Sequence, residues 1–307
     1  MLCFYKTINN AVVRVDTITE GCWVNAVSPT VEEINFLTNE LNVDRDFVNA
    51  ALDEEESSRI ENEDDQTLII IDTPLAITEA NNTLVYTTMP IGIIVTQTNV
   101  VTVCLNETSA ITDIANGFVK NIQTGMKTRF LLTLLLRIAQ SFLIRLKHIN
   151  KMSSHFENEL HKSMKNKELI QLLGLEKSLV YFSTSLKANE ITLEKILRGR
   201  VIKLYEEDQE LLEDVLIEFK QAIEMSNIYS SILSGTMDAF ASIISNNLNI
   251  VMKLLTIITT LMAIPTMIFS YYGMNVSFGW TPEWWMILSF CTVVVAVSGF
   301  FLWHKKY

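Results

Sequence analysis

The second half of the chain has the apolar pattern of long helices. No proline occurs between Pro90 and Pro265, and glycine is rare over the same stretch. Apolar residues recur there at spacings of three and four, which places them on one face of a helix. They are Leu204, Leu211, Val215, Phe219, Ile223, Ile232, Phe240, Ile243 and Leu248. We expect a helical stalk over residues 126–247. A helix unbroken over residues 200–271 would be about 100 Å long, at roughly 1.5 Å per residue.

The first 125 residues have a different pattern, in which β-branched runs alternate with turn residues. Val, Ile and Thr pack well on a pleated surface, so three runs are predicted to be buried strands. These runs are residues 67–77, 83–97 and 99–107. A helix is predicted to start after Ser28 or Thr30, because either residue could form a capping box with Glu32 or Glu33. Residues 1–125 therefore predict an α+β domain built as an α/β/α sandwich.

Two apolar runs near the C-terminus are long enough to cross a bilayer. Residues 250–271 and 284–303 each have about 20 residues, which is the length that a transmembrane helix needs. The expected segments are a first membrane helix over 248–271, a connecting loop over 272–283, a second membrane helix over 284–303 and a basic tail over 304–307.

A third apolar run, residues 130–144, is shorter and has Arg137 in its middle. At about 15 residues it is too short to span a bilayer. We interpret it as a buried helix of a cytoplasmic bundle. Residues 168–197 are expected to pack antiparallel to it and to turn near Gly199 into the long helix.

The distribution of basic residues predicts how the chain is oriented in the membrane. The loop over 272–283 contains no Lys or Arg, whereas Lys253, Lys305 and Lys306 flank the other ends of the two membrane helices. Because basic residues are retained on the cytoplasmic side, both termini are predicted to be cytoplasmic. The sequence thus predicts a multi-pass protein of the cell membrane, in contact with lipid.

Small and polar residues form a stripe along the first membrane helix. At alternating steps of three and four residues the stripe comprises Ser245, Asn249, Met252, Thr256, Thr259, Ala263, Thr266 and Ser270. The other faces are apolar and carry Leu254, Leu255, Ile257, Ile258, Leu261, Ile264, Met267 and Ile268. A polar stripe is costly against lipid, so it is expected to face protein or water.

Two interpretations of this stripe were weighed. Thr and Ser can hydrogen-bond back to their own helix and pack against a neighbour through small residues. Eight positions in register favour a water-filled pathway instead. Two spans cannot enclose a pore, so several copies of the chain must assemble around it. The stripe carries no charge, which suits a hard cation such as Mg²⁺ that keeps much of its water shell.

Composition excludes several other classes of function. A net charge of -11 and a pI near 4.9 argue against a nucleic-acid partner, which requires clustered basic residues. Four scattered cysteines, Cys3, Cys22, Cys104 and Cys291, predict neither disulfides nor a zinc site. The sequence has no phosphate-binding loop, nucleophile elbow or HExxH motif. We therefore expect a protein that is not an enzyme and carries no cofactor. No cleavable signal peptide is visible at the N-terminus.

The loop between the membrane helices resembles a known signature. Tyr272 is followed by Gly273, Met274 and Asn275, directly after one predicted span and before a second that ends in lysines. This arrangement resembles the CorA family of magnesium channels, whose signature is Gly-Met-Asn between two C-terminal spans. The stretch "TPE" ending at Glu283 is similar to the acidic "MPE" of many members, with Thr in place of Met.

The resemblance implies a funnel-shaped homopentamer whose first membrane helix lines the pore. It implies that Asn275 forms a ring that holds the hydrated ion through its waters. Gly273 would support the turn, and Tyr272 and Met274 would fix the loop. The conduit would be lined by Asn249, Met252, Thr256, Thr259, Ala263, Thr266 and Ser270, with Met252 at a narrow hydrophobic gate. Glu283 would attract cations to the outer mouth, although a solvated loop carboxylate explains it equally well.

The same resemblance implies gating by intracellular Mg²⁺ bound to carboxylates between neighbouring subunits. Asp214 corresponds to a regulatory aspartate of the family, and its partner is sought among Asp72, Glu79 and the acidic run over residues 53–65. Divalent cations would then stabilise the closed state preferentially. An acidic run is more commonly a solvated face. The same applies to Glu206, Glu207, Asp208, Glu210 and Glu213.

Taken together, the sequence predicts passive influx of Mg²⁺ driven by the membrane potential, with Co²⁺ and Ni²⁺ as slower substrates. One alternative is Zn²⁺ transport, as in a branch of the same superfamily that has a variant tripeptide. Another is a membrane-tethered metal sensor without transport, which would explain the acidity but not the polar stripe.

Overall fold

The computed structural model describes residues 1–63, 65–78, 84–163, 166–198, 205–274, 279 and 283–304. The chain forms two compact units, Met1–Thr236 and Met237–Tyr307. The first unit contains a mixed sheet and its covering helices, and the second contains two apolar helical segments. An α+β domain followed by long helices and a C-terminal apolar helix was predicted from the sequence, and this prediction is confirmed.

The sheet of the first unit has seven strands in the order β2-β1-β3-β7-β6-β5-β4. Their bounds are β1 (Leu2–Ile8), β2 (Ala11–Val15), β3 (Trp23–Val27), β4 (Arg59–Glu63), β5 (Gln66–Thr78), β6 (Leu84–Val95) and β7 (Val100–Cys104). Strands β3 and β7 are parallel, and the other neighbours are antiparallel. The three strands expected from the sequence are β5, β6 and β7.

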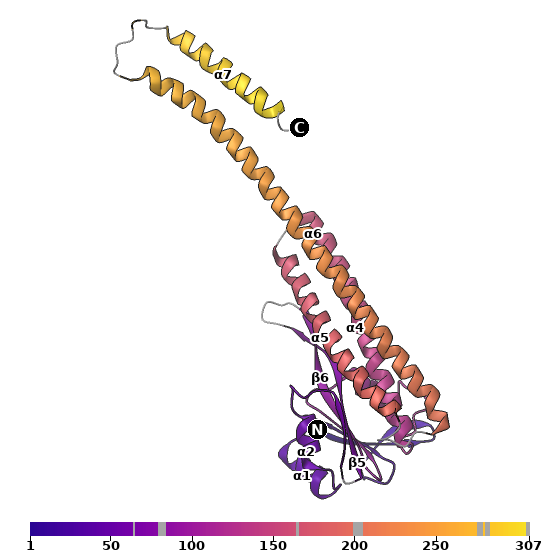
Figure 1. Cartoon of the computed structure of the whole chain (residues 1–307). Helices are drawn as coiled ribbons and strands as arrows, with labels where there is room; N and C mark the ends of the chain where they lie inside the picture. The colour runs from indigo at the N-terminus through magenta and orange to yellow at the C-terminus, as the bar shows by residue number, and fades with distance from the viewer. Residues whose placement is uncertain are drawn as a thin grey trace. The chain divides into compact units, whose positions relative to one another are not determined.

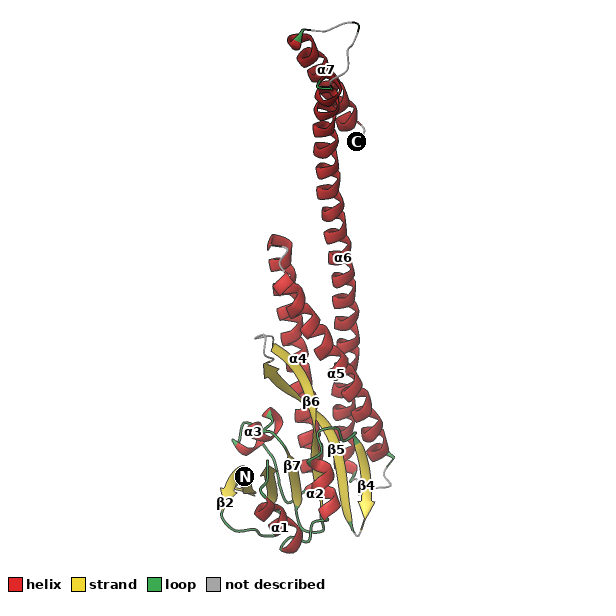
Figure 2. Ribbon diagram, turned by 90° about the vertical axis from the view of Figure 1, so that its left-hand side faces the viewer, coloured by secondary structure: helices red, strands yellow, loops and turns green. Residues whose placement is uncertain are grey.

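Helices cover both faces of this sheet (Figures 1 and 2). One face is covered by α1 (Val31–Asn39) and α2 (Arg45–Ala51), and the other by α4 (Lys127–Ser163) and α5 (Asn166–Leu197). The short helix α3 (Ser109–Ala115) lies beside α4. The predicted capping box is present at α1, where Thr30 and Glu33 form it. The first unit is therefore a three-layer α/β/α sandwich.

Strand β5 shows why both faces must be covered. Leu68 and Ile70 belong to the core cluster beneath α1 and α2. Ile69 and Ile71 point to the opposite face, because successive residues of a strand alternate, and they are equally buried. An uninterrupted apolar run of this kind is typical of a strand with helices on both sides.

Helix α2 approaches the sheet closely at one glycine. A Cβ atom added to Gly92 of β6 would lie only 2.3 Å from the Cβ of Ala51. No side chain can be accommodated at Gly92 unless α2 or β6 moves. Gly92 therefore sets the distance between α2 and the centre of the sheet.

A buried amide joins α5 to β5. The Asn189 side chain accepts a hydrogen bond from the Asp72 backbone N–H at 2.9 Å and donates one to the Asp72 carbonyl at 2.9 Å. Ser58 also donates to Asn189, at 2.7 Å. On one side of Asp72, strand β4 begins only at Arg59, which pairs with Ile70, so β4 does not reach Asp72. On the other side, the residue of β6 opposite Asp72 is Pro90, which has no N–H to donate. Asn189 thus provides the partners that Asp72 lacks within the sheet.

The apolar run over residues 130–144 is buried in the first unit, as predicted. Phe130, Leu135 and Phe142 of α4 are at most 1% exposed. Phe142 packs edge-on against Phe182 of α5, with ring centroids 5.1 Å apart. Residues 199–204, where the chain was expected to turn after Gly199, lie outside the described residues.

The long helix α6 (Glu206–Tyr272) begins in the first unit and continues into the second, with α7 (Trp284–His304) following it. Mean hydropathy reaches 1.8 in α6 and 2.2 over Trp284–Leu302, so two helices are long and apolar enough to cross a membrane. Within the second unit α7 lies against α6, because a Cβ atom at Gly299 would be 3.8 Å from the Leu261 side chain.

The close approach at Gly92 gives a test of the fold. Gly92→Ala should cost about 1–3 kcal/mol of stability by overpacking and lower the melting temperature of the full-length protein in detergent. Gly235→Ala is the matched control, since no atom lies within 4 Å of its added Cβ, and it should melt no lower than wild type. Ala51→Gly combined with Gly92→Ala should recover part of the loss. Equal melting of Gly92→Ala and wild type would contradict the contact.

Candidate cation pathway

The polar stripe lies on the part of α6 that belongs to the second unit. Thr259, Ala263, Thr266 and Ser270 line one open groove along this helix, together with Met262 and Met267. The structure thus brings four stripe residues onto one surface. Met267, which the sequence pattern assigned to an apolar face, also lines that surface. Its spacing of four residues from Ala263 could have revealed this position.

The remaining stripe residues, Ser245, Asn249, Met252 and Thr256, are exposed on the same helix. Their spacings of three and four residues continue the line of the groove towards the N-terminal end of α6. The surface that they form with the groove residues contains amide, hydroxyl and thioether groups and no charge. Below, it is called the pathway face.

Three hydroxyls of the pathway face bond to their own helix. Thr256, Thr259 and Thr266 each donate to the carbonyl four residues earlier, at 2.8, 2.8 and 3.0 Å. This is the arrangement of the structural alternative considered from the sequence. A hydroxyl bonded in this way can still interact with water, since its oxygen keeps lone pairs that accept hydrogen bonds. Each threonine therefore presents an acceptor and no free donor proton.

The signature tripeptide starts at the last turn of α6. Gly273 donates its backbone N–H to the Phe269 carbonyl at 2.9 Å, and a Cβ added to Gly273 would be only 3.1 Å from the same oxygen. Tyr272 packs edge-on against Tyr271 at 5.4 Å between centroids. Met274 is exposed. Asn275 lies outside the described residues.

Glu283 immediately precedes α7. Its backbone carbonyl accepts hydrogen bonds from the N–H groups of Met286 at 2.9 Å and Ile287 at 3.4 Å. Glu283 is therefore at the N-cap position, and its exposed carboxylate is favoured there by the helix dipole. This local role accounts for the residue without a bound ion.

The two proposed regulatory aspartates have different environments. Asp214 is exposed on α6, whose opposite side buries Val215 and Phe219 in the first unit. Asp72 is half-buried against α5. Burial raises the pKa of its carboxyl group, and a hydrogen bond with Ser185 partly opposes that shift. Among the described residues, no group of three or more His, Cys, Asp or Glu side chains could hold a metal ion.

The other candidate acidic residues that the structure describes do not form a preformed metal site either. Arg59 forms ion pairs with Glu56, at 3.3 Å, and with Glu61. Part of the acidic run over residues 53–65 is thus neutralised locally, as expected of a solvated face. Asp64 and Glu79 lie outside the described residues.

Known proteins match this chain over most of its length. The family described as CorA-like Mg²⁺ transporter protein matches residues 19–306. A cobalt/magnesium transport protein CorA from Methanocaldococcus jannaschii is 28% identical over 288 residues, which cover 90% of this chain and 87% of that protein. The complete structure of the CorA magnesium transporter from the same organism matches with a TM-score of 0.83 and 26% identity, covering 98% of this chain and 96% of the other.

A more distant match shows the fold alone. The ZntB cytoplasmic domain from Vibrio parahaemolyticus has a TM-score of 0.60 at 13% identity, over 80% of this chain and 97% of that domain. The family match extends from the sheet through both apolar helices. The chain therefore belongs to the CorA-like Mg²⁺ transporter family.

Proposed function

We propose that this protein conducts hydrated Mg²⁺ into the cell through a pore lined by the pathway face of α6. The observation that carries the proposal is the row of uncharged acceptors on that face. Family membership supports a divalent-cation transporter. The row of acceptors supports an ion that passes with its water shell.

The water shell of the ion explains why acceptors matter more than donors. Waters bound to Mg²⁺ direct their oxygens to the ion and their hydrogens outward, and Mg²⁺ gives up these waters reluctantly. Threonines whose protons are already bonded to the helix offer those hydrogens lone pairs only. Back-bonding and ion conduction are thus compatible uses of the same hydroxyls.

The pore requires several copies of the chain. One pathway face per chain cannot surround an ion, so we propose a homo-oligomer, a pentamer by its likeness to the family, with α6 innermost. Asn275 forms the outer ring that holds the hydrated ion, next to Gly273 and Met274. Met252 narrows the conduit, and Glu283 adds negative potential at the mouth. Both termini are cytoplasmic. Ion entry is driven by the membrane potential, which favours movement of a cation into a negatively charged interior.

Intracellular Mg²⁺ closes the pore by binding between subunits. The exposure of Asp214 on α6 supports this role, since an exposed carboxylate can meet a neighbouring subunit. Asp72 is its proposed partner. Its raised pKa indicates a carboxyl group that gains from a nearby cation. Sites that bind Mg²⁺ only when subunits meet would shift the population towards the closed arrangement.

Zn²⁺ is a weaker candidate for the transported ion. Zinc prefers nitrogen and sulfur ligands, and the pathway face offers only the thioether of Met252 and the methionines of the groove. The intact Gly-Met-Asn also favours Mg²⁺, with Co²⁺ and Ni²⁺ as slower substrates.

Asn275→Ala tests the selectivity ring. Loss of the amide should reduce Mg²⁺ uptake by about tenfold or more, because the hydrated ion loses its binding site at the mouth. Uptake is measured in cells that lack their own Mg²⁺ transporters. Gln221→Ala removes an exposed amide of α6 outside the pathway and should leave uptake unchanged. Normal uptake by Asn275→Ala would rule out the ring, and no uptake by wild type would rule out Mg²⁺ transport.

Ala263→Leu tests the pathway face. The larger side chain should obstruct the groove and abolish most Mg²⁺ uptake, whereas Ile258→Phe adds bulk to an apolar face and should be tolerated. Surface expression of both variants is measured alongside uptake. If both variants conducted equally, α6 would not present this face to the ion.

Asp214→Asn tests the gate. Without this carboxylate the internal Mg²⁺ concentration that halves the current should rise about tenfold, because one charged ligand is lost from the closed state. Patch-clamp recording with controlled internal Mg²⁺ provides the measurement. Glu224→Gln, which removes another exposed carboxylate of α6, should behave as wild type. An unchanged Mg²⁺ response in Asp214→Asn would exclude Asp214 from regulation.

A further inference from the structure

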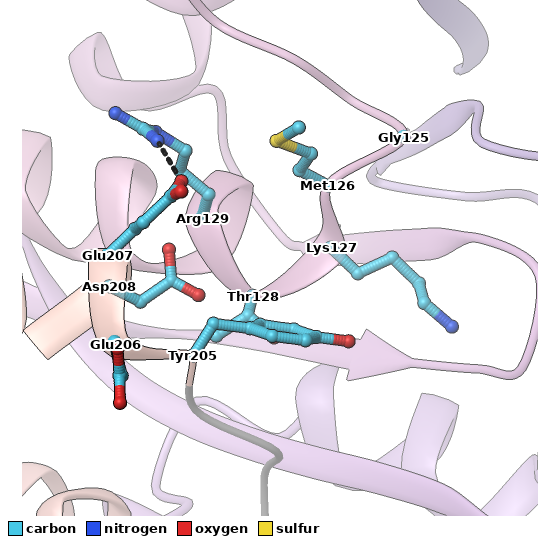
Figure 3. Close-up of a pocket in the computed structure, with 9 residues that line it drawn as sticks. All are labelled: Gly125, Met126, Lys127, Thr128, Arg129, Tyr205, Glu206, Glu207 and Asp208. Carbon is cyan, nitrogen blue, oxygen red and sulfur yellow. Dashed lines mark ion pairs between the residues drawn. The ribbon is translucent and has the colours of Figure 1, made fainter.

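A cavity in the first unit lies apart from the pathway face. It is found where α4 and α6 begin and has a volume of about 600 Å³. Figure 3 shows its lining residues, which are Gly125, Met126, Lys127, Thr128, Arg129, Tyr205, Glu206, Glu207 and Asp208. Small-molecule sites commonly have volumes of about 300–1,000 Å³. The cavity is thus large enough for an organic ligand.

Asp208 is the unusual residue of this cavity. It is only 5% exposed, and its carboxylate points into the space between the two helix starts (Figure 3). Among the described residues its side chain has no hydrogen bond and no ion pair. Its oxygens are not sealed inside the protein, since Glu168 is the described residue that has a fully buried oxygen without a partner. A cationic ligand that enters the cavity can therefore reach the Asp208 carboxylate, where it meets no competing cation. The site therefore favours a ligand that brings positive charge.

The two cations of the cavity are already bonded elsewhere. Lys127 donates its Nζ to the carbonyls of Thr96 at 2.8 Å and Gln97 at 2.6 Å. The Arg129 Nη1 lies 3.9 Å from Glu207 (Figure 3). Neither cation lies within ion-pair distance of Asp208 in the described structure. Three carboxylates against two occupied cations leave the cavity with an excess of negative charge.

The rest of the lining suits a ligand that is partly apolar. The Tyr205 ring extends across the cavity, and the Met126 side chain lies on its other side (Figure 3). An aromatic face attracts ammonium groups, and a thioether packs readily against methylene groups. A bare metal ion would use neither surface. Moreover, no group of three or more His, Cys, Asp or Glu side chains among the described residues could hold one.

We propose that this cavity binds a linear aliphatic diamine or polyamine, with one ammonium group on Asp208. The methylene chain lies between Tyr205 and Met126, and the second ammonium group lies in the open part of the cavity, whose lining has an excess of negative charge. The ligand is thus an organic cation bound within one chain, and it differs in chemistry and place from the transported ion. The inference does not depend on Mg²⁺ conduction.

The test measures binding to the full-length protein in detergent. A ligand that binds only the folded state raises the melting temperature as its concentration increases. 1,4-Diaminobutane should therefore stabilise wild type, whereas 1,4-butanediol, which has the same chain without charge, should not. Asp208→Asn should weaken the apparent affinity for the diamine by about tenfold or more. Glu213→Gln removes an exposed carboxylate of α6 outside the cavity and should bind as wild type does.

Several outcomes would overturn the proposal. They are no stabilisation of wild type by the diamine, an equal response of Asp208→Asn, or an Asp208-dependent shift of the same size with MgCl₂ at matched ionic strength. The last would make this an inorganic cation site. If Asp208→Asn does not fold, Tyr205→Leu replaces it, since Tyr205 is 55% exposed, and it should weaken binding of the diamine several-fold. Unchanged diamine binding by Tyr205→Leu would likewise count against the site. Because transport is not measured, failure here leaves the proposed function untouched.

Discussion

A divalent cation can cross the hydrocarbon layer only if its water shell finds hydrogen-bond acceptors along the way. In the proposed function, the pathway face of α6 supplies these acceptors without charge. Three of its threonines have their protons bonded to carbonyls of the same helix, at 2.8–3.0 Å. Acceptors of this kind have to follow one helix face, and several copies of that face have to meet. The need for a long helix and for an assembly both follow from this requirement.

The first unit holds the beginning of that helix firmly. Leu212, Val215 and Phe219 of α6 are buried. Ser226 donates to the Leu179 carbonyl of α5 at 3.2 Å. Helix α5 is in turn bonded to the sheet through Asn189 and Asp72. A change at the surface of the first unit can therefore reach α6 through α5, which is the mechanical requirement for any gate that acts on the stalk.

Periodic features of the fold were predictable from the sequence, and isolated contacts were not. The candidate membrane helices, α4 to α6, β5 and β6 are long enough for their apolar repeats to identify them. Strand β7 has only five residues, and its unbroken run of β-branched residues identified it. Strands β1 to β4 and the short helices α2 and α3 were missed, because they have five to seven residues each. The hydrogen bonds between Asn189 and Asp72 join residues that are 117 positions apart in the sequence. The unpaired Asp208 likewise depends on packing between distant segments. Of the candidate site, the stripe and the tripeptide were visible in the sequence. Only the structure shows that the threonine hydroxyls donate their protons to carbonyls of their own helix.

The proposed function assigns conduction to uncharged residues and sensing to carboxylates. The chain carries a net charge of -11, yet none of its carboxylates lies on the pathway face. A carboxylate there would bind Mg²⁺ directly once a water was lost, and an ion held that tightly would leave slowly. Asp214, Asp72 and Asp208, the carboxylates that we propose as ligand-binding groups, are instead in the first unit. Neutral oxygens therefore suit a conduction path, in which an ion must be released quickly. Carboxylate oxygens suit a binding site, at which a ligand must remain bound.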